Sequence, residues 1–165
     1  MRAQYLNDSL IEITGIGFLE CQILWRLAAA ADPHDSSAAQ GRISSRPTEN
    51  SHPHIDADWH EHVRPELLHL FASAVEIVRA DLINSSTSPH ANSTVRIPIL
   101  HVKPWLIALN QARLTLAARF SIGEEHANHP APEDLSPTTI AQLFIEFFGV
   151  LQQVLQQVLL KMTED

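Results

Sequence analysis

Residues 104–122, PWLIALNQARLTLAARFSI, decide the fold of this chain. Pro104 suits the first turn of a helix, where its missing N–H costs nothing, and the apolar residues after it recur every three or four positions. They cover most of the helix surface, and a helix of that kind is normally central, with neighbours packed on several sides. We therefore expect a central helix over residues 105–122 that ends near Gly123.

Two stretches outside this helix have the pattern of strands. Residues 10–14, LIEIT, alternate apolar and polar side chains and stop at Gly15, as a short strand does. Residues 95–100, VRIPIL, also have strand character, and Pro98 confines them to the edge of a sheet. We predict that these two stretches pair as a minor two-stranded β element.

Three further stretches predict helices. Residues 18–31 place apolar side chains on one face. Residues 58–84 also repeat apolar side chains at helical spacing, but Pro65 lacks a backbone donor, so we expect a short helix, a break and then a longer helix. Residues 137–161 predict a long last helix with a wide apolar face.

Residues 32–55 contain many Ser, Pro, Asn and His residues and only two bulky apolar ones. Such a segment has little apolar surface to bury, so we predict a long flexible connection there. Taken together, the patterns predict a single helical domain, 1–165, of mainly α class. It should have four main helices around one core and the minor two-stranded β element.

Charge and composition narrow the function classes. The 165 residues include 11 Lys and Arg against 19 Asp and Glu, for a formal charge of −8, which disfavours binding to nucleic acid or an anionic membrane. A single cysteine forms no internal disulfide, the N-terminus lacks the pattern of a secretory signal, and no uninterrupted apolar run reaches membrane-spanning length. We therefore expect a cytoplasmic protein that binds neither nucleic acid nor membrane.

Asn110, Arg113 and Arg119 are polar residues on the otherwise apolar central helix. Asn110 and Arg113 share a face, whereas Arg119 lies nearly opposite Arg113. One interpretation is a binding site for an anion or a peptide carboxylate, since guanidinium offers a fork of donors. The other is structural, with an arginine paired to Glu20 or Glu12 and Asn110 bonded to free carbonyls, because a buried charge requires a partner.

Residues 52–69 contain a cluster of potential metal ligands. Imidazole and carboxylate together suit zinc or another divalent transition metal. The residues that could take part are His52, His54, Asp58, His62, Glu66 and His69. No HExxH pair or cysteine set accompanies them, and the pair His126 and His129 in a Pro-rich loop is weaker still. A solvated, His-rich surface is the simpler interpretation, and a divalent-metal-binding protein or metal-dependent enzyme is the alternative.

Other signatures of catalysis are absent from the sequence. Gly15 and Gly17 follow a strand but lack the remaining residues of a phosphate-binding loop, and no GxSxG motif occurs. Cys21 lies among apolar residues of a predicted helix and is expected to pack there. We therefore expect no cofactor and a non-enzymatic protein with an interaction or regulatory role, whose protein partner the sequence does not name.

Residues 105–119 follow the pattern W-L-x-A-L-N-x-x-R-L-x-L-x-x-R. This pattern resembles the central helix of a bacterial domain-of-unknown-function family whose genes are often found beside the gene for ClpS, the Clp protease adaptor. Glu20 near the start of the first helix adds to the resemblance. Gln111 and Ala117 depart from it, since an acidic residue and a glycine are expected there. The resemblance implies an all-α fold and a cytoplasmic location, but no activity.

The C-terminal helix predicts self-association. Its residues 147–160 keep apolar side chains on a wide face after the other predicted helices are accounted for. Four glutamines between positions 152 and 157 provide neutral flanks that do not repel a second copy. We therefore predict a homodimer through residues 147–160.

Overall fold

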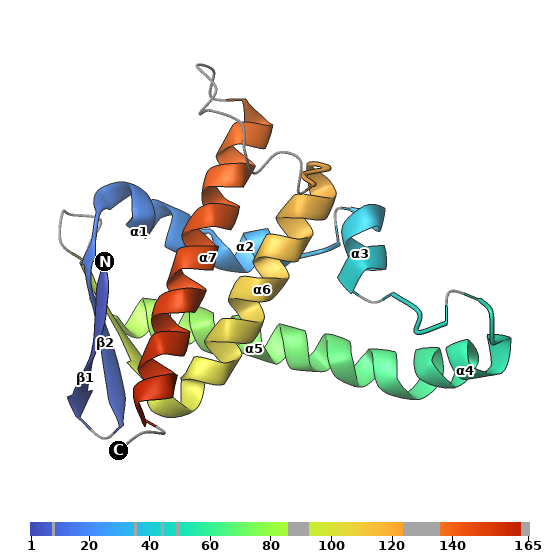
Figure 1. Cartoon of the computed structure of the whole chain (residues 1–165), viewed down its shortest axis with the longest axis horizontal. Coiled ribbons are helices and arrows are strands. Elements are labelled where there is room, and N and C mark those ends of the chain that lie inside the picture. The colour runs from blue at the N-terminus through green and yellow to red at the C-terminus, as the bar shows by residue number, and fades with distance from the viewer. Residues whose placement is uncertain are drawn as a thin grey trace.

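The structure of the chain, a computed structural model, describes residues 1–7, 9–34, 36–43, 45–48, 50–85, 93–123 and 136–162. Helices cover one face of a small sheet, and one long helix extends sideways from this body (Figure 1). In chain order the elements are β1 (Arg2–Asn7), β2 (Leu10–Ile16), α1 (Phe18–Trp25), α2 (Leu27–Ala31), α3 (Ser37–Ile43), α4 (Pro53–Asp58), the π-helical turn η1 (Trp59–Val63), α5 (Arg64–Asn84), β3 (Ser93–Pro98), the 3₁₀ turn η2 (Ile99–His101), α6 (Val102–Arg119) and α7 (Pro137–Met162). The fold is mainly α, as predicted, but the described residues form more helices than the four expected and three strands instead of two.

The sheet is antiparallel, with the strand order β1-β2-β3. The predicted pairing of β2 with β3 is confirmed, and its register places Ile11 opposite Ile97. Both residues and Ile13 are fully buried, so one face of the sheet carries part of the core. The additional strand β1 has no alternating apolar pattern, since all its side chains except Ala3 are exposed. Its backbone pairing with β2 defines it, and a side-chain pattern could not reveal it.

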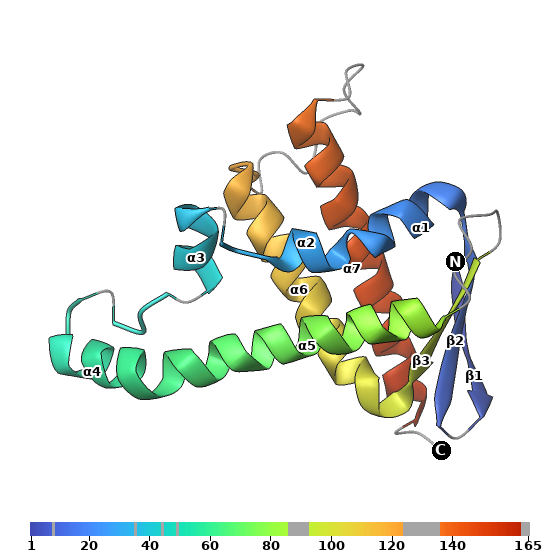
Figure 2. The same cartoon turned by 180° about the vertical axis from the view of Figure 1, so that it is seen from behind.

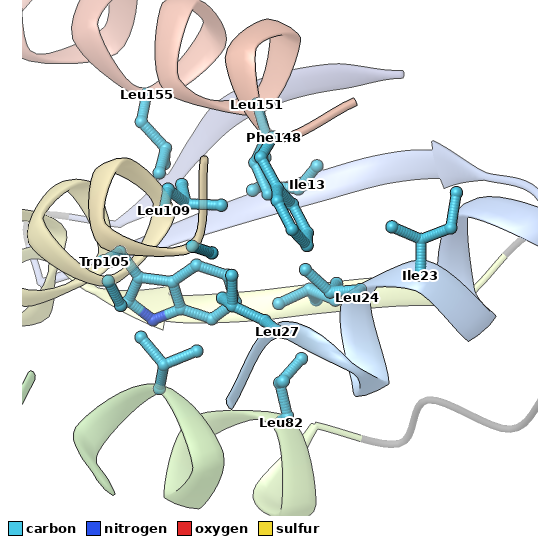
Figure 3. Close-up of a cluster of buried hydrophobic side chains, with 14 of the residues drawn as sticks. Ile13, Ile23, Leu24, Leu27, Leu82, Trp105, Leu109, Phe148, Leu151 and Leu155 are labelled. Atoms are coloured by element: carbon cyan, nitrogen blue, oxygen red, sulfur yellow. The ribbon is translucent and has the colours of Figure 1, made fainter. Parts of the chain in front are cut away.

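Helix α6 is the predicted central helix, and its buried residues lie on several faces. Trp105 is completely buried, and in Figure 3 its ring lies between side chains of α2, α5 and α6, including Leu27, Leu82 and Leu109. A buried tryptophan removes about 150–250 Å² of surface from water, more than most other side chains. The hydrophobic effect at this ring therefore holds three helices together.

Helix α7 packs along α6 and covers the core from the other side. Phe148, Leu151 and Leu155 are fully buried, and Figure 3 shows Phe148 pointing down from α7 toward the side chains of β2 and α1. Near the C-terminal end of the helix, the Tyr5 hydroxyl donates a hydrogen bond to the Val158 carbonyl over 2.7 Å. This bond ties the edge strand β1 to α7.

The first predicted helix, residues 18–31, is divided into α1 and α2 at Arg26. The backbone of Arg26 has φ −90° and ψ 0°, and its N–H bonds the carbonyl of Ile23 as well as that of Leu24. The bond to Ile23 closes a tighter turn than the α-helical one, so the chain direction changes at this residue. The short helix α2 thereby comes to lie against α6 and α5, as both views of the fold show.

The break predicted at Pro65 is replaced by a wide turn within one continuous rod of α4, η1 and α5 (Figure 2). In this turn the N–H of Arg64 bonds the carbonyl of Trp59, five residues earlier. Proline lacks an N–H and crowds the carbonyl of the preceding turn, and a π-helical turn relieves both problems without ending the helix. The helical direction therefore continues past Pro65, contrary to the prediction.

The rod has an outer part that we call the arm, residues 53–73. Every residue of the arm is exposed or half-buried except Asp56. Figure 2 shows the arm standing clear of the sheet and of α7. From Ala74 onward the same rod enters the body, where Val78 and Leu82 are buried.

The segment 32–55, predicted as a flexible connection, contains helix α3 and the start of α4. Ala39 and Ile43 of α3 are buried, and α3 lies beside α6. Two apolar side chains in a largely polar segment are therefore sufficient to place a short helix against the body.

Candidate functional site

Arg113 lies in the contact between α6 and α7. One of its terminal nitrogens donates to the Gln152 side-chain oxygen over 2.6 Å, and Gln152 donates in turn to the Leu106 carbonyl over 3.2 Å. The guanidinium also lies in van der Waals contact with Gly149. The Nε atom of Arg113 is buried, and no protein partner among the described residues reaches it. Arg113 thus serves first as a cross-link between two helices.

Arg119 and Gln111 hold the end of α2. Gln111 donates to the Ala31 carbonyl and Arg119 to the Asp32 carbonyl, both over 2.8 Å. The last carbonyls of a helix have no partner within the helix, so these side chains satisfy groups that would otherwise remain free. The sequence interpretation assigned carbonyl binding to Asn110, whereas the structure assigns it to Gln111 and Arg119. Gln111, Thr115 and Arg119 follow one another every four residues, a spacing that could have identified this polar line.

Glu20 and Asn110 are not joined to these arginines. Glu20 lies at the start of α1 with its carboxylate against Gly17. In the described part of the chain, no ion pair connects Glu20 with Arg113 or Arg119. The predicted pairing of Glu20 with Arg113 or Arg119 is therefore wrong. Glu12, the other carboxylate considered as a partner for these arginines, pairs with Arg96 over 3.2 Å.

Asn110 and Arg113 do share one cavity, as their spacing predicted. It has a volume of about 340 Å³ and lies between α3, α6 and α7, with Arg42 as a second guanidinium in its wall. Glu146 also lines it, and its carboxylate offsets part of the positive charge. Because Arg113 already donates to Gln152, the cavity is less suited to a free anion than the sequence spacing alone suggested.

The predicted metal ligands do not converge. His52 and His54 lie at the start of α4, Asp58 at its end, and the others follow along η1 and α5. All six are exposed. No group of three or more His, Cys, Asp or Glu side chains within the described residues could hold a metal ion. The metal-binding alternative therefore has no support, and His126 and His129 lie outside the described residues.

Asp56, within the same His-rich segment, accepts hydrogen bonds from the protein backbone and has a structural role. Its two carboxylate oxygens accept hydrogen bonds from the backbone N–H groups of Thr48 and Asn50, over 3.1 and 2.7 Å. Burial alone would raise the pKa of the Asp56 carboxyl. Hydrogen bonds from the Thr48 side chain and from the Asn50 and Thr48 backbone, together with the positive charge of Arg46, lower this pKa below the ordinary value of 3.8. The carboxylate therefore fastens the loop before α4 to the tip of the arm.

A polar cluster that the sequence interpretation missed joins α5 to the start of α6. The buried carboxylate of Asp81 accepts hydrogen bonds from Trp105 Nε1 over 2.9 Å and contacts His101 Nδ1 at 2.9 Å. His101 and Trp105 lie 20 and 24 residues after Asp81 in the sequence, so no local spacing could have shown the cluster. A carboxylate that orients a histidine occurs in catalytic and metal sites, but its main effect here is to satisfy the indole N–H inside the core.

Helix α7 leaves a line of apolar side chains uncovered. The exposed members are Ile140, Leu143 and Val150, and the half-buried members are Phe147 and Val154. We call these five residues the α7 stripe. They are spaced three and four residues apart in alternation, the spacing of a helix that packs against another helix. Val158, inside the interface predicted from the sequence, is 6% exposed and belongs to the core, so the uncovered face lies nearer the start of α7 than predicted.

Among the described residues, α7 is the helix long and apolar enough to cross a membrane. An 18-residue window within Pro137–Lys161 has a mean hydropathy of 1.5, and 28% of that window is buried. Length and composition are weak evidence for a membrane span, because the core helix of a soluble protein meets the same criteria. The low buried share shows that the other described residues leave much of this apolar helix without cover.

Comparison with known proteins assigns the chain to a family without assigning an activity. No curated protein and no solved structure matches it significantly. The family model described as "Domain of unknown function (DUF2017)" matches residues 4–159. Because the match spans nearly the whole sequence, the chain belongs to this domain-of-unknown-function family.

Proposed function

We propose that this protein is a non-enzymatic interaction protein and that the α7 stripe is its docking face. The observation that carries the proposal is the line of exposed or half-buried apolar side chains on α7, Ile140, Leu143, Phe147, Val150 and Val154. Contiguous apolar surface on a folded protein typically marks a site of association. The gene neighbourhood implied by the family resemblance, beside the gene for an adaptor of a protease, is in keeping with a regulatory role.

The occupant that we propose for the α7 stripe is the same helix of a second copy. Side chains spaced alternately three and four residues apart interlock with an identical set, so the stripe is complementary to itself. Between residues 137 and 162 the only charged side chains are Glu146 and Lys161, which have opposite signs. Two copies of α7 therefore meet with little electrostatic repulsion.

The overall charge argues against nucleic acid and anionic membrane as the occupants of the α7 stripe. With a formal charge of −8, the protein is repelled by nucleic acid and by anionic lipid. Neutral lipid remains a physical competitor for an apolar helix face, because insertion depends on buried apolar area as well as on charge. The experiment below therefore also measures binding to neutral lipid vesicles.

The test compares the mass of the protein in solution with and without the stripe. Light scattering after gel filtration, at micromolar protein, should give a dimer for the wild type and a monomer for the double variant Leu143→Glu, Val150→Glu. Both side chains are more than 40% exposed, so the fold should tolerate the change. The matched control is Ile83→Glu, Leu100→Glu, which adds the same charge at exposed residues outside the stripe and should leave the dimer intact.

Three results would contradict the proposal. A wild-type protein that is monomeric at micromolar concentration removes the second copy as the occupant. A wild type that is monomeric in solution but floats with zwitterionic phosphatidylcholine vesicles, while the stripe variant does not, assigns the stripe to lipid. A dimer that survives in the stripe variant places the interface elsewhere.

A further inference from the structure

A cavity of about 540 Å³ lies between α2, α5 and α6, on a different part of the surface from the α7 stripe. Its apolar wall comes mainly from Leu68, Phe71, Ala72 and Val75 of α5, and Ala28 of α2 faces them. Sites for small molecules typically have volumes of about 300–1,000 Å³ and combine such walls with a few polar groups. The cavity therefore has the size and lining of a ligand site.

Gln111 supplies a side-chain oxygen that has no hydrogen-bond donor among the described residues. It lines the cavity, and its side chain is 6% exposed. Its Nε2 donates to the Ala31 carbonyl over 2.8 Å, which fixes the amide so that the free end is the oxygen. No donor among the described residues reaches this oxygen. A buried acceptor without a donor is unfavourable, so a ligand that supplies an N–H group is favoured here.

Two carboxylates, Asp32 and Glu76, and one guanidinium, Arg79, line the rim of the cavity, and the Arg119 guanidinium donates to the Asp32 backbone carbonyl. Glu76 and Arg79 pair with each other over 2.8 Å and largely cancel. Asp32 also lines the cavity, and none of the ion pairs in the described part of the chain includes it. One of its oxygens accepts from the His34 N–H over 2.9 Å, which leaves the second oxygen for a ligand. His34 and His69 complete the polar rim.

Asp32 and Gln111 belong to the same wall of the cavity. Gln111 is bonded to the carbonyl of Ala31, the residue immediately before Asp32. Two acceptors, one neutral and one anionic, are thereby held beside an apolar surface. A primary ammonium group has three donors and can use both acceptors at once, whereas a hydroxyl has one donor and no charge.

We propose that this cavity binds a small primary amine in its ammonium form, with an apolar substituent of about the size of a phenyl ring. The ammonium donates to Gln111 Oε1 and to the Asp32 carboxylate. The substituent packs against Phe71 and Val75. No bond is made or broken, so the site is one of recognition.

The probe for this site is 2-phenylethylamine, measured by titration calorimetry and by amide chemical-shift changes. A saturable Kd on the order of 1 mM is expected for a compound of this size. The isosteric alcohol, 2-phenylethanol, should bind about tenfold more weakly because it lacks the charge-assisted hydrogen bond. The anion 3-phenylpropionate should not bind, because the Asp32 carboxylate repels it.

Two pairs of variants locate the binding. Ala72→Trp fills the cavity from an exposed position and should abolish binding, whereas Ala80→Trp, exposed on the same helix outside the cavity, should leave Kd unchanged. Asp32→Asn should raise Kd about tenfold, whereas the exposed Asp58→Asn, with the same change of charge, should not. A urea unfolding curve for each variant confirms that the fold is retained.

The proposal is overturned by any of three results. The first is the absence of saturable binding of 2-phenylethylamine to the wild type. The second is equal affinity for the amine and the alcohol, which would remove the role of Asp32. The third is unchanged amine binding in a folded Ala72→Trp protein, which would place the probe outside this cavity.

Discussion

The arm and the body contain the same kind of helix but are stabilised in different ways. Residues 64–84 form one continuous helix, α5, with apolar side chains at helical spacing throughout. In the half that crosses the body, Ala74, Val78 and Leu82 are buried by α2, α6 and the sheet. In the half that belongs to the arm, no side chain is buried. An apolar stripe therefore predicts which face of a helix can be buried. The elements that pack against the helix decide how much of that face is buried.

The largest effect that tests this comparison is a matched pair of leucine truncations in α5. Leu82 is 4% exposed and Leu70 is 47% exposed. Leu82→Ala should lower the free energy of unfolding by about 2–5 kcal/mol, since it leaves a cavity in the core. Leu70→Ala should change it by about 0.5 kcal/mol or less. Urea unfolding of both variants measures the difference, and equal losses would show that the arm is packed in solution against a surface that the single chain does not provide.

A smaller effect is expected from the polar cluster that joins α5 to α6 within the body. Asp81→Ala removes the acceptor of the buried Trp105 N–H, so the free energy of unfolding should fall by about 1–3 kcal/mol. Asp58→Ala, an exposed aspartate on the arm, is the control and should have little effect. If Asp81→Ala were as stable as the wild type, the indole N–H would have another partner, and the cluster would not hold the two helices together.

Sequence reasoning succeeded where the pattern is local. The central helix was placed within a few residues because its apolar spacing and Pro104 are contiguous, and the pairing of β2 with β3 followed from two short alternating stretches. Sequence reasoning failed where backbone geometry determines the secondary structure. Strand β1 has no apolar face to identify it, and the turn before Pro65 widens instead of breaking the helix.

The candidate sites show the same division. Asn110 and Arg113 were correctly placed on one face because the helical period fixes it, and they do line one cavity. Their partners come from distant parts of the chain: Gln152 lies 39 residues from Arg113, and the Ala31 carbonyl lies 80 residues from Gln111. A guanidinium can pair with a carboxylate, an amide or a carbonyl, and nothing local to the sequence distinguishes them. The paired arginine and glutamate expected from charge alone were therefore wrong.

The smallest effect on global stability is expected at the tip of the arm, where Asp56 is the single buried residue. Asp56→Ala removes the acceptors of the Thr48 and Asn50 amides, so hydrogen exchange at these two amides should accelerate while exchange in the core, at Val78, stays unchanged. The urea midpoint should move little, because the arm contributes no apolar core.

The hydrogen bonds between Asp56 and the Thr48 and Asn50 amides should also respond to acid. Since the folded-state pKa of Asp56 is lowered, its contribution is complete above the ordinary value of 3.8 and is lost as the pH falls through the lowered value. The Thr48 and Asn50 amide shifts should therefore titrate with a midpoint below 3.8, and a midpoint above that value would show that burial outweighs the hydrogen bonds at this carboxylate.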